Sequence, residues 1–428
     1  MISQYSFFNE LDEKFGDLNS TTFIDNMKLP IHRWYRYTAG FSAAWVGSLI
    51  EKEKKYGRIN VLDPFSGSGT VPLESLFLNV NAFGLESHPY AYKISKCKLN
   101  FNSLVSNDFR SFSKLFLDEA KANDSSPDDF PQLICRCFPG QTLKELNSLK
   151  QTWANMKAGY LKDMMWFVIT AILRSVSPVG TAQWQYILPN KSKSRVLMPY
   201  EAFSKKIEEI CNDISLLQPC KKTSQILLLN QDAREEENEI PDTWADLVIT
   251  SPPYANNYDY ADAMRLEMLF WGDISNWSGL KTISSKLVRA CTQHVGGLKK
   301  EVSDLLNDPL LSPIQDELLE KFELLATERE SHGGKKNYHF MVVAYFYDMA
   351  KVFQMLARKT ASNCKMCFVI GDSAPYGVYI PVDDWLGKLA LNSGFSSYHF
   401  EKLRDRNNKW KNRKHKVPLK EGRLWILK

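Results

Sequence analysis

Short apolar runs alternate with amphipathic stretches along this 428-residue chain. Several runs have the length and the apolar, β-branched content of buried strands, at residues 58–62, 82–85, 225–230, 245–249, 366–370, 396–403 and 423–427. Between them, apolar residues recur at helical spacing, through Leu73, Leu76, Phe77 and Val80 and again through 340–350. Alternating strands and helices predict an α/β fold built around one sheet.

Two long stretches separate the strands into three groups. Residues 101–221 read mostly as helices, and residues 273–337 form a polar stretch. The sheet is therefore expected to assemble from residues 25–100, 222–272 and 338–428. Because connecting segments vary while the scaffold persists, we expect substrate-specific structure in the two insertions.

The first candidate for chemistry is the loop Asp63-Pro64-Phe65-Ser66-Gly67-Ser68-Gly69-Thr70, which follows a strand and precedes a helix. Gly67 and Gly69 let the backbone turn sharply and approach a ligand without a Cβ in the way. Glu86 ends the next strand, where a carboxylate can accept hydrogen bonds from ribose hydroxyls. A plain tight turn is the alternative, but strand, glycine turn, helix and acid together indicate half of a nucleotide-binding βαβ unit.

The second candidate is Ser251-Pro252-Pro253-Tyr254, which follows the strand 245–249. Two prolines remove backbone donors and stiffen the turn, so that carbonyls point outward. The tyrosine ring beyond them offers a stacking face. A polyproline ligand or an ordinary loop is the alternative, and the preceding buried strand disfavours it.

Together, DPFSGSGT at 63–70 and SPPY at 251–254 resemble the two signatures of the DNA amino-methyltransferases. The segment His32–Tyr37 with Gly40-Phe41-Ser42 resembles the helix that precedes the cofactor loop in that family, and NNYDYADAMRLEMLFWG resembles the family's segment after the tetrad. The resemblance implies a Rossmann-like class I methyltransferase sheet with helical insertions. In it, residues 25–100, 222–272 and 338–428 form the catalytic domain that binds S-adenosylmethionine. Residues 101–221 are a largely helical insertion and the candidate DNA-recognition region, and residues 273–337 are a second insertion and a candidate DNA-contacting region.

The resemblance also implies roles for individual residues. Ser251 Oγ and the Pro252 carbonyl would accept hydrogen bonds from the target amine, Pro253 belongs to the same rigid turn, and Tyr254 would stack on the extruded base. Asp232, at the end of the strand 225–230, would lie near the adenine; a helix-capping role is its alternative. The implied cofactor-binding set is Asp63, Phe65, Ser66, Gly67, Gly69, Thr70, Glu86 and Asp232.

The implied reaction is methyl transfer to an exocyclic amine in double-stranded DNA. A serine at the first tetrad position favours cytosine N4 over adenine N6, and a cognate restriction nuclease or defence system is the implied setting. An adenine or RNA methyltransferase is the alternative enzyme. A non-catalytic, methyltransferase-like subunit that binds nucleic acid is the alternative of another class.

Charge adds candidate DNA contacts. The net charge is +5, yet residues 401–428 contain 11 Lys/Arg against 3 Asp/Glu. Lys191, Lys193 and Arg195, and in the basic tail Arg404, Arg406, Lys411 and Arg413, are candidates for phosphate contacts; a solvated charged surface is the alternative for each group.

The cysteines, the histidines and the N-terminal segment bear on metal binding and on location in the cell. The eight cysteines and seven histidines show no zinc-ribbon spacing, so we expect no metal site. The N-terminus lacks the basic start and apolar run of a signal peptide, and a cytoplasmic location is expected.

Overall fold

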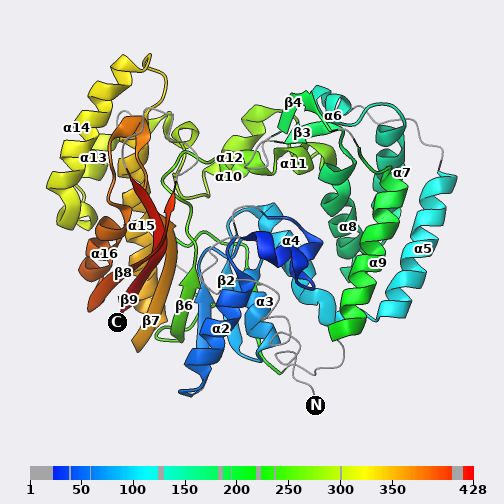
Figure 1. The fold of residues 1–428 in the computed structure, drawn as a ribbon, viewed down its shortest axis with the longest axis horizontal. Coiled ribbons are helices and arrows are strands. Elements are labelled where there is room, and N and C mark those ends of the chain that lie inside the picture. Colours follow the sequence, from blue (N-terminus) through cyan, green and yellow to red (C-terminus); the bar gives the residue numbers. More distant parts are fainter. Residues whose placement is uncertain are drawn as a thin grey trace.

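The computed structural model describes residues 23–37, 40–57, 59–123, 130–181, 187–193, 195–217, 223–235, 238–298, 301–406 and 418–428. A seven-stranded sheet with the order β5-β2-β1-β6-β7-β9-β8 organises the molecule (Figure 1). Its strands are β1 (Asn60–Asp63), β2 (Asn81–Leu85), β5 (Ile226–Leu229), β6 (Ala245–Thr250), β7 (Thr360–Gly371), β8 (Ser397–Arg406) and β9 (Leu419–Leu427). All neighbouring pairs from β5 to β7 are parallel, and β9 runs antiparallel to β7 and β8.

All seven expected strands are confirmed, and the sheet is consistent with the class I methyltransferase fold that the resemblance implies. β7 begins about six residues earlier than the apolar pattern indicates, because its first half is polar and partly exposed. The helix expected at His32–Tyr37 is wrong, because this segment contains only the short 3-10 helix η2 (His32–Trp34). The regular helix before the glycine turn is α2 (Ala43–Lys54).

Alternating side chains of the strands build two cores, one on each face of the sheet. Val61, Leu247, Ile249 and Val369 pack with α2, whereas their neighbours Leu62, Val248 and Phe368 pack with α15 (Tyr338–Lys359) and α16 (Val382–Asn392). This alternation follows from the two-residue period of a strand. Burial on both faces explains why these strands read as continuous apolar runs.

The helices next to the sheet and after the tetrad complete this part of the chain. They are α3 (Thr70–Phe77), α4 (Pro89–Leu99), α10 (Tyr260–Ala263) and α11 (Arg265–Trp271), with the 3-10 helices η1 (Phe23–Lys28), η3 (Asn100–Ser103) and η8 (Pro375–Gly377). Of the described helices, α15 alone is long and apolar enough to span a membrane by length and composition; most of it is buried in the protein, as in the core helix of a soluble protein.

The described residues of the insertion 101–221 form a helical lobe beside the sheet (Figure 1). Its helices are α5 (Ser106–Ala122), α6 (Gln132–Cys137), α7 (Gln141–Asn155), α8 (Tyr160–Val176) and α9 (Pro199–Leu217). The antiparallel hairpin of β3 (Val179–Thr181) and β4 (Ile187–Ser192) lies between α8 and α9 in the chain. The sequence indicated the helices but not the hairpin.

The stretch 273–337 is also largely helical, which its polar composition does not reveal. It holds η4 (Trp277–Gly279), α12 (Leu280–Ser284), η5 (Thr292–Val295), α13 (Val302–Leu306), η7 (Pro309–Ile314) and α14 (Gln315–Ser331). In α14 only Leu318 and Leu325 are buried, so its apolar stripe is too narrow to give a helical pattern.

Candidate active site

The chain order of the strands reverses between β1 and β6. From β1 the sheet continues through β2 and β5 on one side, and from β6 through β7 on the other. In open α/β sheets, ligands bind beyond the carboxyl ends of the strands at such a switch point. The glycine turn follows β1 and the tetrad follows β6, so both lie at this position.

The glycine turn is held in one conformation by close packing. Gly67 and Gly69 have φ angles of +52° and +84°, and Gly69 is the N-cap of α3. A Cβ on Gly69 would lie 2.1 Å from Ser95 Oγ, and a Cβ on Gly67 would lie 2.9 Å from the Tyr37 ring. Both glycines are therefore required by backbone conformation and by space.

Glu86 fixes the turn from the end of β2. One carboxylate oxygen accepts a hydrogen bond from the Gly67 N–H at 2.7 Å, and the other accepts from the His88 N–H at 2.7 Å. Burial raises the pKa of Glu86 to about 7, against the opposing effect of these two donors. A carboxylate is thus held at the floor of the turn, where it can receive ligand hydroxyls.

Asp63 lies beneath the turn and joins β1 to β6. It accepts hydrogen bonds from the Phe65 N–H at 3.0 Å and from Thr250 Oγ1 at 2.7 Å. Burial raises its pKa to about 7. Because Thr250 directly precedes the tetrad, Asp63 ties the glycine turn to the tetrad.

The tetrad is anchored at its serine and at its tyrosine. Ser251 Oγ donates to the Val369 carbonyl on β7 at 3.2 Å, so its hydrogen is engaged and its lone pairs can accept. The Tyr254 N–H donates to the Tyr260 hydroxyl at 3.4 Å, and the Arg406 guanidinium lies 5.3 Å from the centre of the Tyr254 ring. Pro252 is buried between them.

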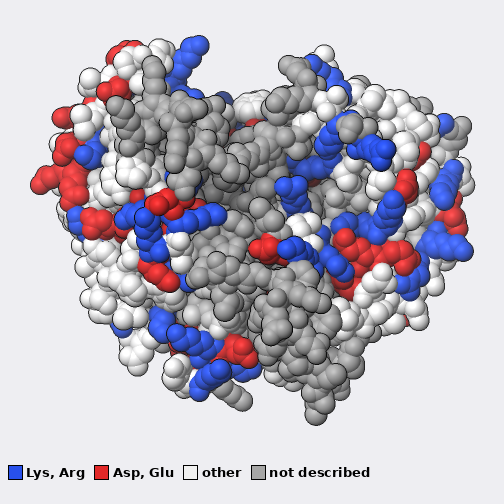
Figure 2. All heavy atoms as spheres, in the orientation of Figure 1, with Lys and Arg blue, Asp and Glu red and all other residues white. Residues whose placement is uncertain are grey.

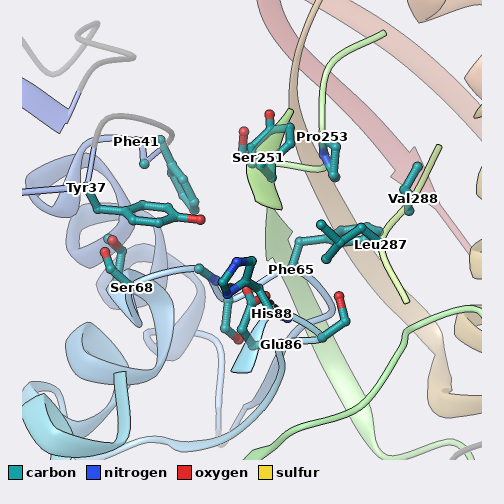
Figure 3. Close-up of a pocket in the computed structure, with 16 residues that line it drawn as sticks. Tyr37, Phe41, Phe65, Ser68, Glu86, His88, Ser251, Pro253, Leu287 and Val288 are labelled. Carbon is teal, nitrogen blue, oxygen red and sulfur yellow. Dashed lines mark hydrogen bonds between the residues drawn. The ribbon is translucent and has the colours of Figure 1, made fainter. Parts of the chain in front are cut away.

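One pocket joins the two motifs. It is partly open to solvent. Expected site residues that line it are Phe65, Ser66, Gly67, Thr70, Glu86, Ser251 and Pro253. Ser251 and Pro253 lie at the end of β6, across from Tyr37 and Glu86 (Figure 3).

Other residues that line the pocket lie outside the two motifs and were not predicted as site residues: Tyr37, Phe41, His88, Tyr260, Leu287 and Val288. Tyr37 and Phe41 approach from the segment before α2, and Leu287 and Val288 form the opposite wall (Figure 3). They supply rings and aliphatic surface around the polar floor at Glu86.

His88 adds a polar group to this wall. Its Nδ1 accepts a hydrogen bond from the Tyr90 N–H at the start of α4, so the hydrogen is on Nε2. Nε2 is buried and has no hydrogen-bond partner in the described part of the chain. Burial lowers the pKa of His88 to about 4, which keeps the ring neutral. In the sequence, only the proline of Ser87-His88-Pro89, a residue common in the first turn of a helix, could have indicated that His88 caps α4.

Asp232 is not among the described residues that line the pocket. Its carboxylate accepts two hydrogen bonds from Arg234 Nε, each at 3.0 Å, and pairs with Arg234 Nη2 at 2.5 Å. Arg234 also reaches Asp348 on α15 at 2.9 Å. Asp232 is therefore engaged in an ion-pair network next to the pocket.

The basic candidates differ in their surroundings. Among the described residues visible in Figure 2, basic and acidic groups are interspersed. Lys193 donates to the carbonyls of Arg174 and Ser177 at 2.6 and 3.2 Å, so it caps the C-terminus of α8. Arg195 is exposed. The side chain of Lys191, and Lys411 and Arg413 entirely, lie outside the described residues.

Of the candidate DNA contacts in the tail, the two that are described, Arg404 and Arg406, are paired with acids. Arg404 is half-exposed and forms an ion pair with Glu421 at 2.7 Å. Arg406 is largely buried and donates to the Asp372 carbonyl at 2.9 Å, beside the Tyr254 ring. Arg406 therefore belongs to the surroundings of the tetrad rather than to an open basic surface.

Asp259, Cys291 and His294 have ligand atoms within 4.8 Å of one another. His294 Nε2 pairs with Asp259 Oδ1 at 3.2 Å, and that oxygen also accepts the N–H groups of Ala261 and Asp262 as the cap of α10. Burial raises the pKa of the Cys291 thiol to about 12. The contacts of Asp259 and His294 in the described part of the chain are thus a helix cap and an Asp–His pair.

The chain is similar to curated DNA methyltransferases, while no protein-family model matches it. It is 24% identical over 432 residues to the Type II methyltransferase M.BsoBI of Geobacillus stearothermophilus, an alignment that covers 89% of this chain and 82% of the relative. It is 27% identical over 434 residues to the Type II methyltransferases M.AvaI of Nostoc sp. and of Anabaena variabilis, covering 92% of this chain and 87% of each relative. Motifs, fold and alignments therefore agree that the chain is similar to the Type II methyltransferases.

Proposed function

We propose that the chain transfers a methyl group from S-adenosylmethionine to the exocyclic N4 amine of a cytosine in double-stranded DNA. The observation that carries this proposal is that Ser251 and Gly67 line one pocket at the switch point of the sheet. A methyl donor held by the glycine turn and an amine held by the tetrad would meet in that pocket.

The pocket fits the cofactor chemically. S-adenosylmethionine presents ribose hydroxyls, an adenine ring and a methionine chain, and its sulfonium supplies an electrophilic methyl group. Glu86 would accept the ribose hydroxyls, and the aromatic and aliphatic walls would enclose the adenine. The buried Nε2–H of His88 lacks a partner in the described part of the chain and can donate to a ligand acceptor. The turn of Phe65, Ser66 and Gly67 would hold the methionine part.

The tetrad supports the acceptor side of the reaction. An exocyclic amine is a poor nucleophile because its lone pair is delocalised into the ring. Ser251 Oγ, its own hydrogen donated to Val369, would accept one amine hydrogen, and the Pro252 carbonyl would accept the other. Both acceptors stabilise positive charge that develops on nitrogen, and preorganised partners of this kind stabilise transition states strongly.

The base must leave the duplex to reach this pocket. Tyr254 is not among the described residues that line the pocket, and it would stack on the base from the end of the tetrad. Such stacking contributes roughly 1–3 kcal/mol. Serine at the first tetrad position favours cytosine. We further propose that the helical lobe of residues 101–221 contacts DNA, and that the enzyme serves a restriction-modification system, as the names of its relatives indicate for those proteins.

The test is to express the chain in a bacterial host without methyltransferases and to sequence its DNA with a method that distinguishes N4-methylcytosine from N6-methyladenine. We expect N4-methylcytosine at one defined sequence. Ser251→Ala should lower turnover on the order of a hundredfold and leave cofactor affinity unchanged. Ser48→Ala, which removes a hydroxyl that also donates to a backbone carbonyl, is the matched control.

Each alternative gives a different result. Detection of N6-methyladenine would show that the target base is adenine, and the proposed mechanism would still apply. Methylation of RNA and not of DNA would show that the substrate is RNA. Absence of S-adenosylmethionine binding in calorimetry would refute the enzyme and favour a non-catalytic subunit that binds nucleic acid.

A further inference from the structure

The segment 285–292 crosses from the cofactor side of the pocket to the loop that follows the tetrad, and we call it the strap. It belongs to the insertion 273–337, between α12 and η5, and has no regular secondary structure before Thr292. Leu287 and Val288 are buried and form the wall opposite Tyr37 (Figure 3). An irregular segment can form a fixed wall only if other contacts restrict its backbone.

The first anchor of the strap is a buried ion network. Asp348 on α15 accepts hydrogen bonds from Arg289 N–H at 2.9 Å, Nε at 3.0 Å and Nη2 at 2.6 Å. Arg234 Nη1 donates to the same carboxylate at 2.9 Å, and Arg234 Nη2 donates to the Ser285 carbonyl at 3.1 Å. The Asp348 side chain is 2% exposed and those of Arg289 and Arg234 are 20% and 12% exposed. Charge-assisted, multidentate pairs of this kind restrict geometry most strongly.

The second anchor is Asn257, three residues after Tyr254. Its N–H donates to the Ala290 carbonyl at 3.0 Å, and its Oδ1 accepts from the Thr292 N–H at 2.8 Å and from Thr292 Oγ1 at 2.7 Å. Asn257 has a φ of +66°, a conformation that asparagine tolerates better than most residues. Three hydrogen bonds therefore connect the strap to the tetrad loop.

We propose that the strap is a wall of the cofactor site, and that Arg289, Arg234, Asp348 and Asn257 are positioning residues that hold it. Arg289 acts through its neighbours Leu287 and Val288, which contact the ligand. Asp232 orients Arg234, so it supports cofactor binding without contacting the adenine. This inference rests on the proposed function, and it gives part of the insertion 273–337 a cofactor-binding role.

The test measures binding of S-adenosylhomocysteine to the full chain by calorimetry, without DNA, so that activity is not needed. Leu287→Ala removes one lining side chain, and Arg289→Gln removes the tether. Each should weaken binding on the order of tenfold, equivalent to about 1.4 kcal/mol. Arg289→Lys keeps the charge but cannot reproduce the bidentate contact, so it should give an intermediate loss.

Two comparisons separate positioning from general damage. Arg423→Gln removes an arginine that is more deeply buried than Arg289, pairs with Glu401 and packs on Trp45, and should leave affinity unchanged. The double variant Leu287→Ala/Arg289→Gln should bind only slightly more weakly than either single variant, because both changes remove the same contact. If the losses of binding free energy in the two single variants simply add in the double variant, as they do for independent sites, Arg289 does not act through the strap and the inference is wrong.

The outcomes also separate this inference from the proposed function. If the wild-type chain binds the ligand while Leu287→Ala and Arg289→Gln bind equally well, the strap is not a wall of the site and the inference is wrong. If the wild-type chain does not bind, the proposed function itself fails. Should Arg289→Gln not fold, as judged by circular dichroism, Leu287→Ala and Arg289→Lys decide the question by the same criterion.

Discussion

The sharpest prediction concerns Gly69, where the backbone and a neighbouring helix both exclude a side chain. Alanine at this position must adopt a φ near +84°, which costs a non-glycine residue roughly 1–2 kcal/mol. Its Cβ would lie 2.1 Å from Ser95 Oγ and 3.0 Å from Ser95 Cβ. Overpacking of this degree costs about 1–3 kcal/mol. Gly69→Ala should therefore destabilise the protein by roughly 2–5 kcal/mol in total.

A second substitution distinguishes these two contributions. Ser95 Oγ is buried and has no hydrogen-bond partner in the described part of the chain, so Ser95→Ala alone should be close to neutral. In Gly69→Ala/Ser95→Ala, the collision with Oγ disappears, whereas the left-handed φ and the close Cβ remain. The double variant should recover part of the lost stability, but not all of it.

The assay is thermal unfolding by calorimetry, with urea unfolding as a second measurement. Gly69→Ala should lower Tm by several degrees, and the added Ser95→Ala should restore part of that loss. A Gly69→Ala variant as stable as the wild type would show that the turn is looser than its packing indicates. A double variant no more stable than Gly69→Ala would show that Ser95 is not the obstacle.

The titratable groups and the tetrad give three further predictions. Because the pKa of Glu86 is about 7 in the free protein and a ribose hydroxyl pairs with the ionised form, cofactor affinity should rise from pH 6 to pH 8; Glu86→Gln should remove that dependence in calorimetry. A carboxyl whose pKa is raised on folding contributes stability that is fully present below its unfolded pKa, 3.8 for Asp63 and 4.5 for Glu86, and that is lost as pH rises through the folded pKa of about 7. The Tm of the cofactor-free protein should therefore fall across that interval in a thermal scan, and less steeply in Asp63→Asn. Arg406→Gln should lower kcat/KM for DNA a few-fold by releasing the Tyr254 ring, in line with about 0.5–2 kcal/mol for a cation–π contact, whereas an equal loss in Arg404→Gln would contradict that reason.

The sequence predicted the sheet and the parts of the site that are local in the chain. Strands buried on both faces leave continuous apolar runs, and the glycine turn and the tetrad each occupy one short segment. Since both follow parallel strands, their carboxyl-end position was implied as well. The shared pocket of Gly67 and Ser251 agrees with this reasoning.

The remaining walls of the pocket could not be predicted, because they depend on tertiary packing. Leu287 and Val288 are an apolar pair in a polar stretch, and nothing local shows that α15 holds them against the glycine turn through Asp348. An acid at a strand end such as Asp232 can bind a ligand or an arginine, and only the position of Arg234 distinguishes the two. Lys193 could contact phosphate by its charge, yet it caps α8.

The place of β9 in the sheet has a consequence for synthesis of the protein. β9 lies between β7 and β8, although it follows both in the chain. Until β9 has been synthesised, the edge of β7 that faces away from β6 therefore has no partner strand. Unpaired strand edges promote aggregation. Val369, whose carbonyl accepts the Ser251 hydroxyl, lies opposite Arg423 of β9. The strand behind the tetrad serine therefore gains its second neighbour only after β9 has been synthesised, so a nascent chain completes this part of the sheet later than the rest.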